Sequence, residues 1–166
     1  MIDTDRLVLI PLTAAQLNLW VNDMEALEHA LTCKYMAESM EGFFRDIVKS
    51  QLAKVLDDET NYLFHTFWLM IRKNDRAVVG SFGFKDAPNP ELEVEVGYGL
   101  GKAFEGHGYM SEGIQALCRW SKLQPGISCL IAETEPGNPQ SENVLKRCGF
   151  EPYHQDDNGN LWWKFA

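Results

Sequence analysis

Two glycines, Gly106 and Gly108, stand just before a helix that the sequence predicts over about Tyr109 to Lys122. Because glycine has no Cβ, the chain at these positions can turn tightly and let a ligand approach the backbone. The first N–H groups of a helix have no partner within the helix, and the helix dipole makes that end positive. These residue types at this spacing favour an anion site, most naturally for phosphates. The alternative is a tight turn without a ligand.

Two other phosphate-binding motifs are absent from the chain. The GxxxxGK[ST] loop does not occur, and no GxGxxG opens a helix with an acidic residue about 20 positions further on. The glycine loop also lacks the lysine of a P-loop. The sequence therefore does not indicate nucleoside triphosphate chemistry.

A strand predicted over Leu92 to Leu100 leads into the loop, and the predicted helix leads away from it. The period of two in the strand places apolar side chains on one face and acidic side chains on the other. The apolar set is Leu92, Val94 and Val96, and the acidic set is Glu91, Glu93 and Glu95. In the helix, residues spaced for one face predict contact with a core. They are Met110, Ile114, Leu117, Cys118 and Ser121.

Three segments resemble those of the GNAT N-acetyltransferases. Residues 98–112 are similar to the acyl-CoA loop of that family, in which [QR]-x-x-G-x-[GA] follows a strand and enters a helix. Residues 138–150 resemble its N-x-x-S-x-x-[VL]-x-x-x-G-F segment. Residues 4–12 resemble the first strand of the subgroup that contains ribosomal-protein N-terminal acetyltransferases. The segments lie in the family's order and span nearly the whole chain.

Aligned on the loop pattern, Leu100 ends the strand, and the motif positions are filled by Glu105, Gly108 and Met110. Glu112 matches a glutamate that is common one turn into the helix. Glu105 stands where the family has Gln or Arg, and Met110 where it has Gly or Ala. A carboxylate therefore lies beside the expected diphosphate, and the loop is more crowded. Both changes predict weaker cofactor binding, although backbone N–H donors do not depend on side-chain identity.

The resemblance implies an α+β fold of the GNAT type, with a mixed, mostly antiparallel central sheet, helices on both faces and one domain over residues 1–166. It implies transfer of an acetyl group from acetyl-CoA to a primary amine, on a protein N-terminus or a small molecule, by direct attack in a ternary complex. Backbone groups of Tyr98, Gly99 and Leu100 would pair with the pantetheine arm as an added strand. The other implied cofactor contacts are Glu105, Gly106, His107, Gly108, Tyr109, Met110, Ser111, Asn138 and Ser141.

Amide formation from an amine and a thioester needs a base for the protonated amine and a proton for the leaving thiolate. Glu95 is the first candidate base, on the strand that splays from its neighbour in this family. Glu93 lies on the same face and could share the role, in which case one carboxyl of the pair would have a raised pKa. The alternative is a row of solvent-facing carboxylates. Weaker candidates on the next strand are Glu133 and Glu135.

Two positions in the second segment concern the leaving group. Ser141 matches a serine that the subgroup places near the CoA sulfur, where its hydroxyl could donate to the thiolate. The alternative is a first-turn serine that bonds only backbone. Leu145 stands where many relatives carry a tyrosine general acid, so that mechanism is closed to this chain. No cysteine fills a motif position, and a covalent acyl-enzyme is not indicated.

Periodicity and breaker residues predict the remaining elements. Strands are predicted over 6–12, 63–72, 77–85, 128–134, 150–153 and 161–165, and helices over 13–20, 40–56 and 138–148, with helix and loop over 24–39. Thr13 and Gln16 form a capping box, Asn138 is an N-cap, and Gly149 ends its helix. An apolar stripe predicts that the 40–56 helix packs on a core, and the resemblance implies that this early helical region lies where the family builds much of its acceptor pocket. Its members are Phe43, Phe44, Ile47, Val48, Leu52, Val55 and Leu56.

The composition is that of an ordinary globular protein, with 45% hydrophobic and 23% charged residues in 166. A formal charge of −9 argues against a nucleic-acid partner, because such binding depends on Lys and Arg contacts to phosphate. No apolar run is long enough for a membrane span, and the N-terminus lacks a secretory signal, so a cytoplasmic protein is expected. Without C-x-x-C pairing, the cysteines are expected to be free thiols rather than disulfides or metal ligands. They are Cys33, Cys118, Cys129 and Cys148.

An anionic cofactor on an acidic protein requires local positive charge. Candidates near the two cofactor segments are Lys102, His107, Lys122, Lys146 and Arg147. The acidic surface suits a cationic amine through electrostatic steering. The acceptor and the choice between monomer and homodimer stay open. The rival interpretations are a non-catalytic acyl-CoA-binding module on the same fold and an interaction protein without a small ligand.

Overall fold

The structure is a computed structural model that describes residues 1–166. The strands are Ile2–Asp3 (β1), Leu7–Pro11 (β2), Lys34–Tyr35 (β3), Phe67–Arg72 (β4), Ala77–Phe84 (β5), Glu93–Leu100 (β6), Cys129–Thr134 (β7), Glu151–Gln155 (β8) and Leu161–Phe165 (β9). The helices are Ala14–Asn22 (α1), Met24–Leu31 (α2), Gly42–Asp57 (α3), Tyr109–Ser121 (α4) and Pro139–Arg147 (α5), with 3₁₀ helices at Glu59–Phe64 (η1) and Lys102–Phe104 (η2). No helix is long and apolar enough to span a lipid bilayer.

The strands form one mixed sheet in the order β1-β2-β4-β5-β6-β7-β9-β8, with the short β3 beside β5. All pairs are antiparallel except β3 with β5 and β6 with β7. Helices lie on both faces. The predicted α+β architecture, with a mixed and mostly antiparallel sheet, is confirmed.

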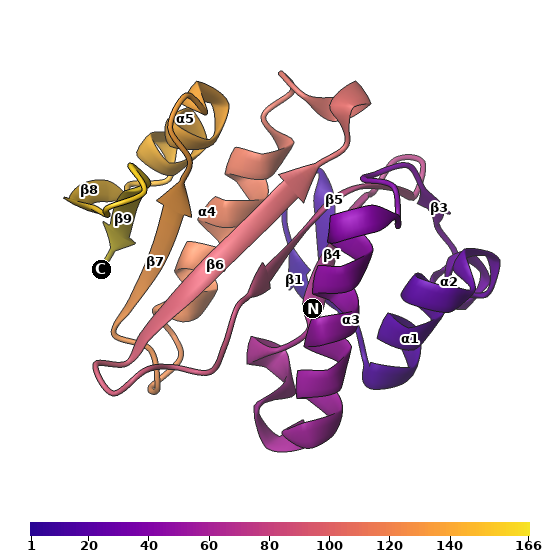
Figure 1. Cartoon of the computed structure of the whole chain (residues 1–166). Coiled ribbons are helices and arrows are strands. Elements are labelled where there is room, and N and C mark those ends of the chain that lie inside the picture. The colour runs from indigo at the N-terminus through magenta and orange to yellow at the C-terminus, as the bar shows by residue number, and fades with distance from the viewer.

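Strand β6 separates from β7 partway along its length. The two strands pair only at Glu93–Glu95 and Cys129–Ile131, whereas β6 stays paired with β5 as far as Leu100. Figure 1 shows β6 and β7 starting together at lower left and diverging upward, with α4 behind the gap. Residues 96–100 therefore form an open edge of β6, whose backbone has no strand partner on the β7 side.

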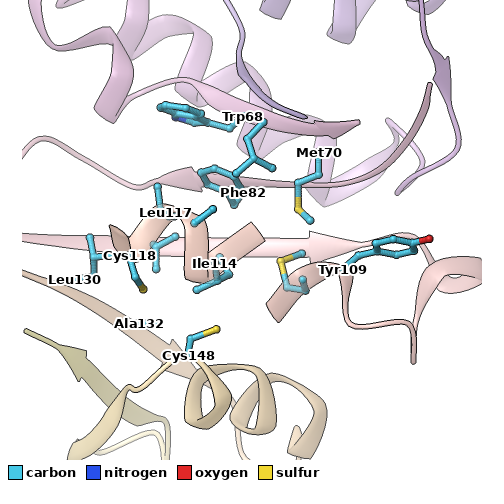
Figure 2. Packing of buried hydrophobic residues seen from close by; sticks show 14 of the residues in the cluster. Trp68, Met70, Phe82, Tyr109, Ile114, Leu117, Cys118, Leu130, Ala132 and Cys148 are labelled. Atoms are coloured by element: carbon cyan, nitrogen blue, oxygen red, sulfur yellow. The ribbon is translucent and has the colours of Figure 1, made fainter. Parts of the chain in front are cut away.

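Each face of the sheet has its own core. On one face α4 packs against the sheet, and its buried Ile114 and Leu117 belong to the same core as Trp68 and Phe82, which Figure 2 shows. Leu145 of α5 belongs to the same core. On the opposite face, α1, α2 and α3 enclose a second core that includes Trp20. The sheet thus separates the α4 side, where the glycine loop begins, from the α3 side.

The residues predicted to cap helices make the expected hydrogen bonds or backbone turns. Thr13 and Gln16 form both hydrogen bonds of a capping box at α1. Asn138 Oδ1 accepts from the N–H of Ser141 at the start of α5. Gly149 follows α5 with a φ of 88°. Because a side chain at such a φ is strained, the stop after α5 depends on glycine.

The prediction of a strand over residues 63–72 is wrong for its first residues. Residues 59–64 form η1, and β4 begins only at Phe67. The carboxylate of Asp58 stabilises this turn, because its Oδ2 lies 2.9 Å from Nε2 of His65. The apolar side chains that suggested a strand pack against the core from a 3₁₀ helix instead.

The apolar stripe predicted for α3 is only partly buried. Val48 and Val55 lie in the core, whereas Phe43 is 81% exposed and Leu56 is 60% exposed. The helix meets the sheet along the narrow line of its buried residues, and Phe43 and Ile47 lie beside a cleft. The prediction that the whole stripe is core is therefore wrong.

Leu92 does not lie in the core, although the alternation grouped it with the apolar residues Val94 and Val96. It precedes β6, has a φ of 60° and is 44% exposed. The side chain of Asn89 accepts from the N–H groups of Glu91 and Glu93, which fixes a turn at this point. The alternation therefore begins one residue later than predicted, at Glu93.

Candidate active site

The glycine loop presents a run of free backbone donors. The N–H groups of residues 106–111 have no backbone acceptor, and no side chain caps α4. Gly106 and Gly108 adopt φ values of 80° and 78°, so both positions use the left-handed region that favours glycine. Unpaired donors at the positive end of a helix bind phosphate groups well. The geometry fits the diphosphate site that the sequence predicts.

Arg6 and Glu112 hold this loop against the first strands. Arg6 Nε lies 2.6 Å from Glu112 Oε2, and Arg6 Nη1 donates to the carbonyl of His107. The N–H of Arg6 and the hydroxyl of Thr4 donate to the other carboxylate oxygen. Burial alone would raise the pKa of Glu112, but these hydrogen bonds outweigh burial and lower it. The loop is thus fixed in a shape that leaves its N–H groups unpaired.

The two departures from the family pattern have different outcomes. The side chain of Met110 is 5% exposed and packs in the core on the α4 side, so it does not crowd the loop as predicted. The reason is that Met110 lies in the first turn of α4 on the helix face toward the sheet. Glu105 is exposed at the end of η2, beside the loop. One carboxylate therefore does lie next to the candidate diphosphate site.

The open edge of β6 offers further backbone groups. Backbone hydrogen bonds to β5 are made by the carbonyl of Glu95 and the N–H of Gly101, at the two ends of the β5–β6 ladder. The backbone N–H and C=O groups of the odd-numbered residues of β6 therefore point toward β5. By the alternation of an antiparallel ladder, the residues that face the open edge are Val96, Tyr98 and Leu100. Gly99 was expected to pair with the pantetheine arm, but its backbone groups face β5. Val96 is the additional residue on this edge.

Tyr98 and Ser141 meet across the gap between β6 and α5. The phenol oxygen of Tyr98 lies 2.7 Å from Oγ of Ser141 and 3.2 Å from the Ser141 carbonyl. Burial raises the pKa of Tyr98 to about 12, and the hydrogen bond with Ser141 opposes this only in part. The phenol therefore keeps its proton at neutral pH. The sequence indicated only a backbone role for Tyr98, because its partner lies 43 residues away.

Glu93 and Glu95 each form an ion pair with a different lysine. Lys164 Nζ lies 2.6 Å from Glu93 Oε1, and Lys85 Nζ lies 2.6 Å from Glu95 Oε1. The hydrogen bond from Lys164, followed by that from Asn89, lowers the pKa of Glu93. The raised pKa that a proton-sharing pair would give is therefore not found at Glu93. Glu95 keeps Oε2 free of protein hydrogen bonds.

Lys85 connects Glu95 to the weaker candidate Glu133. Its Nζ is 3.4 Å from Glu133 Oε1. Burial alone would lower the pKa of Lys85, but the hydrogen bond and charge of Glu95 and the charge of Glu133 outweigh burial and raise it. Lys85 is thus an ammonium at neutral pH. Glu135, the other weaker candidate, lies apart from this group and lines the cleft.

A cleft of about 1200 Å³ lies on the α3 side of β6. Its floor includes Gly97, Tyr98 and Gly99, and its wall includes Phe43 and Ile47 of α3. The cleft therefore reaches the same strand that carries the open edge. The resemblance pointed to the early helical region as part of an acceptor pocket, but the sequence did not identify the cleft itself, because its lining also comes from β5, β6 and the loop after β3.

The chain matches a family model for the acetyltransferase (GNAT) domain over residues 6–151. The chain belongs to the GNAT acetyltransferase family. In GNAT terms, the open edge of β6 and the loop before α4 carry the resembling segment 98–112, and the start of α5 lies in the segment 138–150. The structure brings these parts together around the gap between β6 and β7.

Individual relatives agree with this assignment. The uncharacterized N-acetyltransferase YjdG of Bacillus subtilis (strain 168) is 27% identical over 121 residues, which are 72% of this chain and 67% of that protein. A putative GNAT-family acetyltransferase from Bordetella pertussis superposes with a TM-score of 0.70 at 23% identity, covering 99% of this chain and 98% of that one. The ribosomal-protein acetyltransferase RimL in complex with coenzyme A gives a TM-score of 0.70 at 15% identity, covering 98% and 95%. The two structures show a shared GNAT fold.

The basic residues predicted near the GNAT cofactor segments fall into two groups. Lys102 and His107 lie at the glycine loop, where Arg6 joins them. The others lie at the carboxyl ends of α4 and α5, away from the free N–H groups, and they are Lys122, Lys146 and Arg147. Sequence reasoning missed Arg6, whose only sequence signal was its place in the first strand. The local positive charge at the loop is therefore smaller than predicted.

The cysteines of this GNAT domain are free thiols, as predicted. Cys118, Cys129 and Cys148 are buried, and Cys33 is half-buried. Burial raises the pKa of Cys118 to about 12 and that of Cys148 to about 11. Both thiols are therefore protonated at neutral pH and are poor nucleophiles.

Proposed function

We propose that this protein transfers an acetyl group from acetyl-CoA to a primary amine by direct attack in a ternary complex. The free N–H groups of residues 106–111, beside the open edge of β6, carry the proposal. They fit a diphosphate and an extended arm that continues from it along the strand. When bound, acetyl-CoA supplies a thioester that the amine attacks at its carbonyl carbon, forming an amide and releasing a thiol.

Glu95 is the proposed base for the protonated amine. Its Oε2 is free while Oε1 pairs with Lys85. Its side chain lies on the same face of β6 as Gly97, which lines the cleft. One ammonium proton would pass through water to Glu95, and the neutral nitrogen would then have a lone pair for attack.

Ser141 is the proposed donor to the leaving sulfur, with Tyr98 behind it. The hydroxyl pair lies at the gap between β6 and α5, and the phenol holds its proton at neutral pH. Ser141 would give a proton as the carbon–sulfur bond breaks and take one from Tyr98. The second proton of the attacking nitrogen would restore the pair through solvent. The Tyr98 phenol thus supplies the tyrosine that Leu145 cannot.

The proposed acceptor is a protein N-terminus or a small-molecule amine. The relative YjdG is named as an N-acetyltransferase, and RimL acts on a ribosomal protein. Both names are consistent with an amine nucleophile. The cleft on the α3 side, which reaches β6, is the proposed place for it.

The test measures coenzyme A binding by thermal shift and acetyl transfer by release of free thiol over a panel of amines. We expect coenzyme A to stabilise the protein, and Glu95→Gln to lower kcat by about a hundredfold while that stabilisation is kept. Glu133→Gln removes the other carboxylate near Lys85 and shows whether the loss arises from disturbing that lysine. Absence of any stabilisation by coenzyme A would overturn the proposal. Stabilisation without turnover of any amine would identify a non-catalytic acyl-CoA-binding module.

A further inference from the structure

We infer that the cleft on the α3 side of β6 selects a protonated amine that carries an apolar group and no carboxylate, with Glu38 attracting the ammonium into the cleft before it reaches Glu95. The inference rests on the proposed acetyl transfer, because it specifies which amines the enzyme accepts. It concerns a glutamate outside the three segments that resemble the family.

The charges in the cleft favour a cation. Its carboxylates make no ion pair within the protein, and they are Glu38, Glu41, Asp46 and Glu135. Its two lysines are already neutralised. Lys54 lies 3.5 Å from Asp86, and Lys85 holds two glutamates. The charge available to a ligand is therefore negative.

Glu38 is the cleft carboxylate that lies against β6. Its Oε2 would be 3.1 Å from a Cβ placed on Gly99, so the absent side chain at Gly99 makes room for it. The hydroxyl of Tyr35 donates to the backbone carbonyl of Glu38 and holds the loop in place. Residues 36 and 37 of the same loop touch Gly101 at the end of β6. Glu38 thus stands beside the strand along which the thioester would lie.

Glu38 has no counter-charge within the protein. The residue is exposed to the cleft, no salt bridge of the protein includes it, and burial of part of its carboxyl raises its pKa. An arriving ammonium would provide the missing counter-charge.

The apolar wall defines the rest of the ligand. Phe43 is 81% exposed and Ile47 is 36% exposed, although the core on this side is complete without them. Phe44 and Phe67 line the same cleft. Binding sites of this kind combine apolar walls with a few placed polar groups. An aromatic or large aliphatic group beside the amine would cover Phe43.

This combination separates the classes of amine. A hydrophobic peptide N-terminus and an arylalkyl amine each place one ammonium beside an apolar group. A free amino acid adds a carboxylate that would meet the carboxylates of the cleft without a free lysine. A polyhydroxylated amine has no apolar group to place against Phe43 and Ile47. The first two classes are therefore the expected acceptors.

The experiment compares three amines with the whole protein: phenethylamine, phenylalanine and ethylamine. Phenylalanine differs from phenethylamine by the carboxylate, and ethylamine lacks the ring. We expect kcat/KM for phenethylamine to exceed that for each of the others by about tenfold or more, because unpaired like charges and lost burial both weaken binding. Glu38→Gln should lower kcat/KM for phenethylamine about tenfold, mainly through KM. Glu151→Gln, an exposed change on β8, should leave it unchanged.

The outcomes separate this inference from the proposed function. If coenzyme A stabilises the protein but phenylalanine or ethylamine reacts as well as phenethylamine, the selectivity is overturned and acetyl transfer stands. An unchanged KM in Glu38→Gln overturns the role of Glu38, and turnover of none of the three amines overturns the selectivity. If coenzyme A does not stabilise the protein, the acetyl-transfer proposal itself fails.

Discussion

The two sides of β6 offer different groups to the proposed ligands. Along the open edge and the glycine loop, the available groups are main-chain N–H and C=O groups, which exist whatever the side chains are. On the α3 side, the available groups are carboxylates and aromatic rings that α3 and the loop after β3 bring to the cleft. The first side depends on backbone conformation and the second on side-chain identity. If the proposed sites are the functional ones, substitutions on the α3 side should change the accepted amine without changing binding of coenzyme A.

The two sides also differ in how firmly they are held. The loop is tied to the first strands through Arg6 and Glu112. The cleft wall presents Phe43 and Ile47 with little support from the core. Variants on each side therefore separate cofactor binding from acceptor binding.

The largest expected effect is that of Gly108→Val on coenzyme A binding. Gly108 has a φ of 78°, where a β-branched residue is strained by about 2 kcal/mol, so the loop would relax to another conformation. Binding must then restore the turn, and the Kd should rise about thirtyfold. Calorimetric titration with coenzyme A measures this.

Gly126→Val is the matched control for that variant. Gly126 has no positive φ, and nothing lies within 4 Å of a Cβ placed there. Its Kd for coenzyme A should equal that of the wild type. Equal affinities of the Gly108 and Gly126 variants would show that the loop conformation does not determine binding.

A smaller effect is expected from Glu112→Gln, and it depends on pH. The pKa of Glu112 is lowered in the folded protein, so its contribution to stability is present above its unfolded pKa and is lost as pH falls through the folded value. Wild type should exceed the variant by about 1–2 kcal/mol in free energy of unfolding at neutral pH. That difference should narrow below about pH 4.5. Urea unfolding at a series of pH values measures it, and a difference independent of pH would contradict the role of the carboxylate.

The smallest effect on stability is expected from Phe43→Ala. Because Phe43 is 81% exposed, its removal should change the free energy of unfolding by less than about 0.5 kcal/mol. The Kd for coenzyme A should not change, whereas KM for phenethylamine should rise about threefold to tenfold. Steady-state kinetics and thermal unfolding test this together. A loss of stability similar to that of a core Phe would show that α3 buries this side chain after all.

Much of the α4 side is predictable from sequence because its signals are local. The glycine pair, the N-cap at Asn138, the stop at Gly149 and the alternation of β6 each involve residues within a few positions of one another. Such signals fix backbone conformation directly. The helices α4 and α5 and the donor loop could therefore be predicted closely.

The α3 side is harder to predict because its interactions are distant. The strand assigned over residues 63–65 failed because a contact from Asp58 favoured a 3₁₀ turn over the strand propensity. The short strands β1 and β3 have too few residues to show a period. On the α4 side too, the contacts that no local signal predicts join residues far apart in sequence, as Tyr98–Ser141 and Arg6–Glu112 do. No spacing rule connects such pairs.

The short ladder between β6 and β7 has a mechanical consequence. The block formed by β7, β8, β9 and α5 is attached to the rest of the sheet by the register of Glu93–Glu95 with Cys129–Ile131, by packing through α4 and by a few side-chain contacts such as Tyr98–Ser141 and Lys164–Glu93. A molecule lying along the open edge of β6 would add a further attachment between the two blocks. The ligand-bound protein would then unfold as one cooperative unit, with the two blocks less tightly coupled when the ligand leaves.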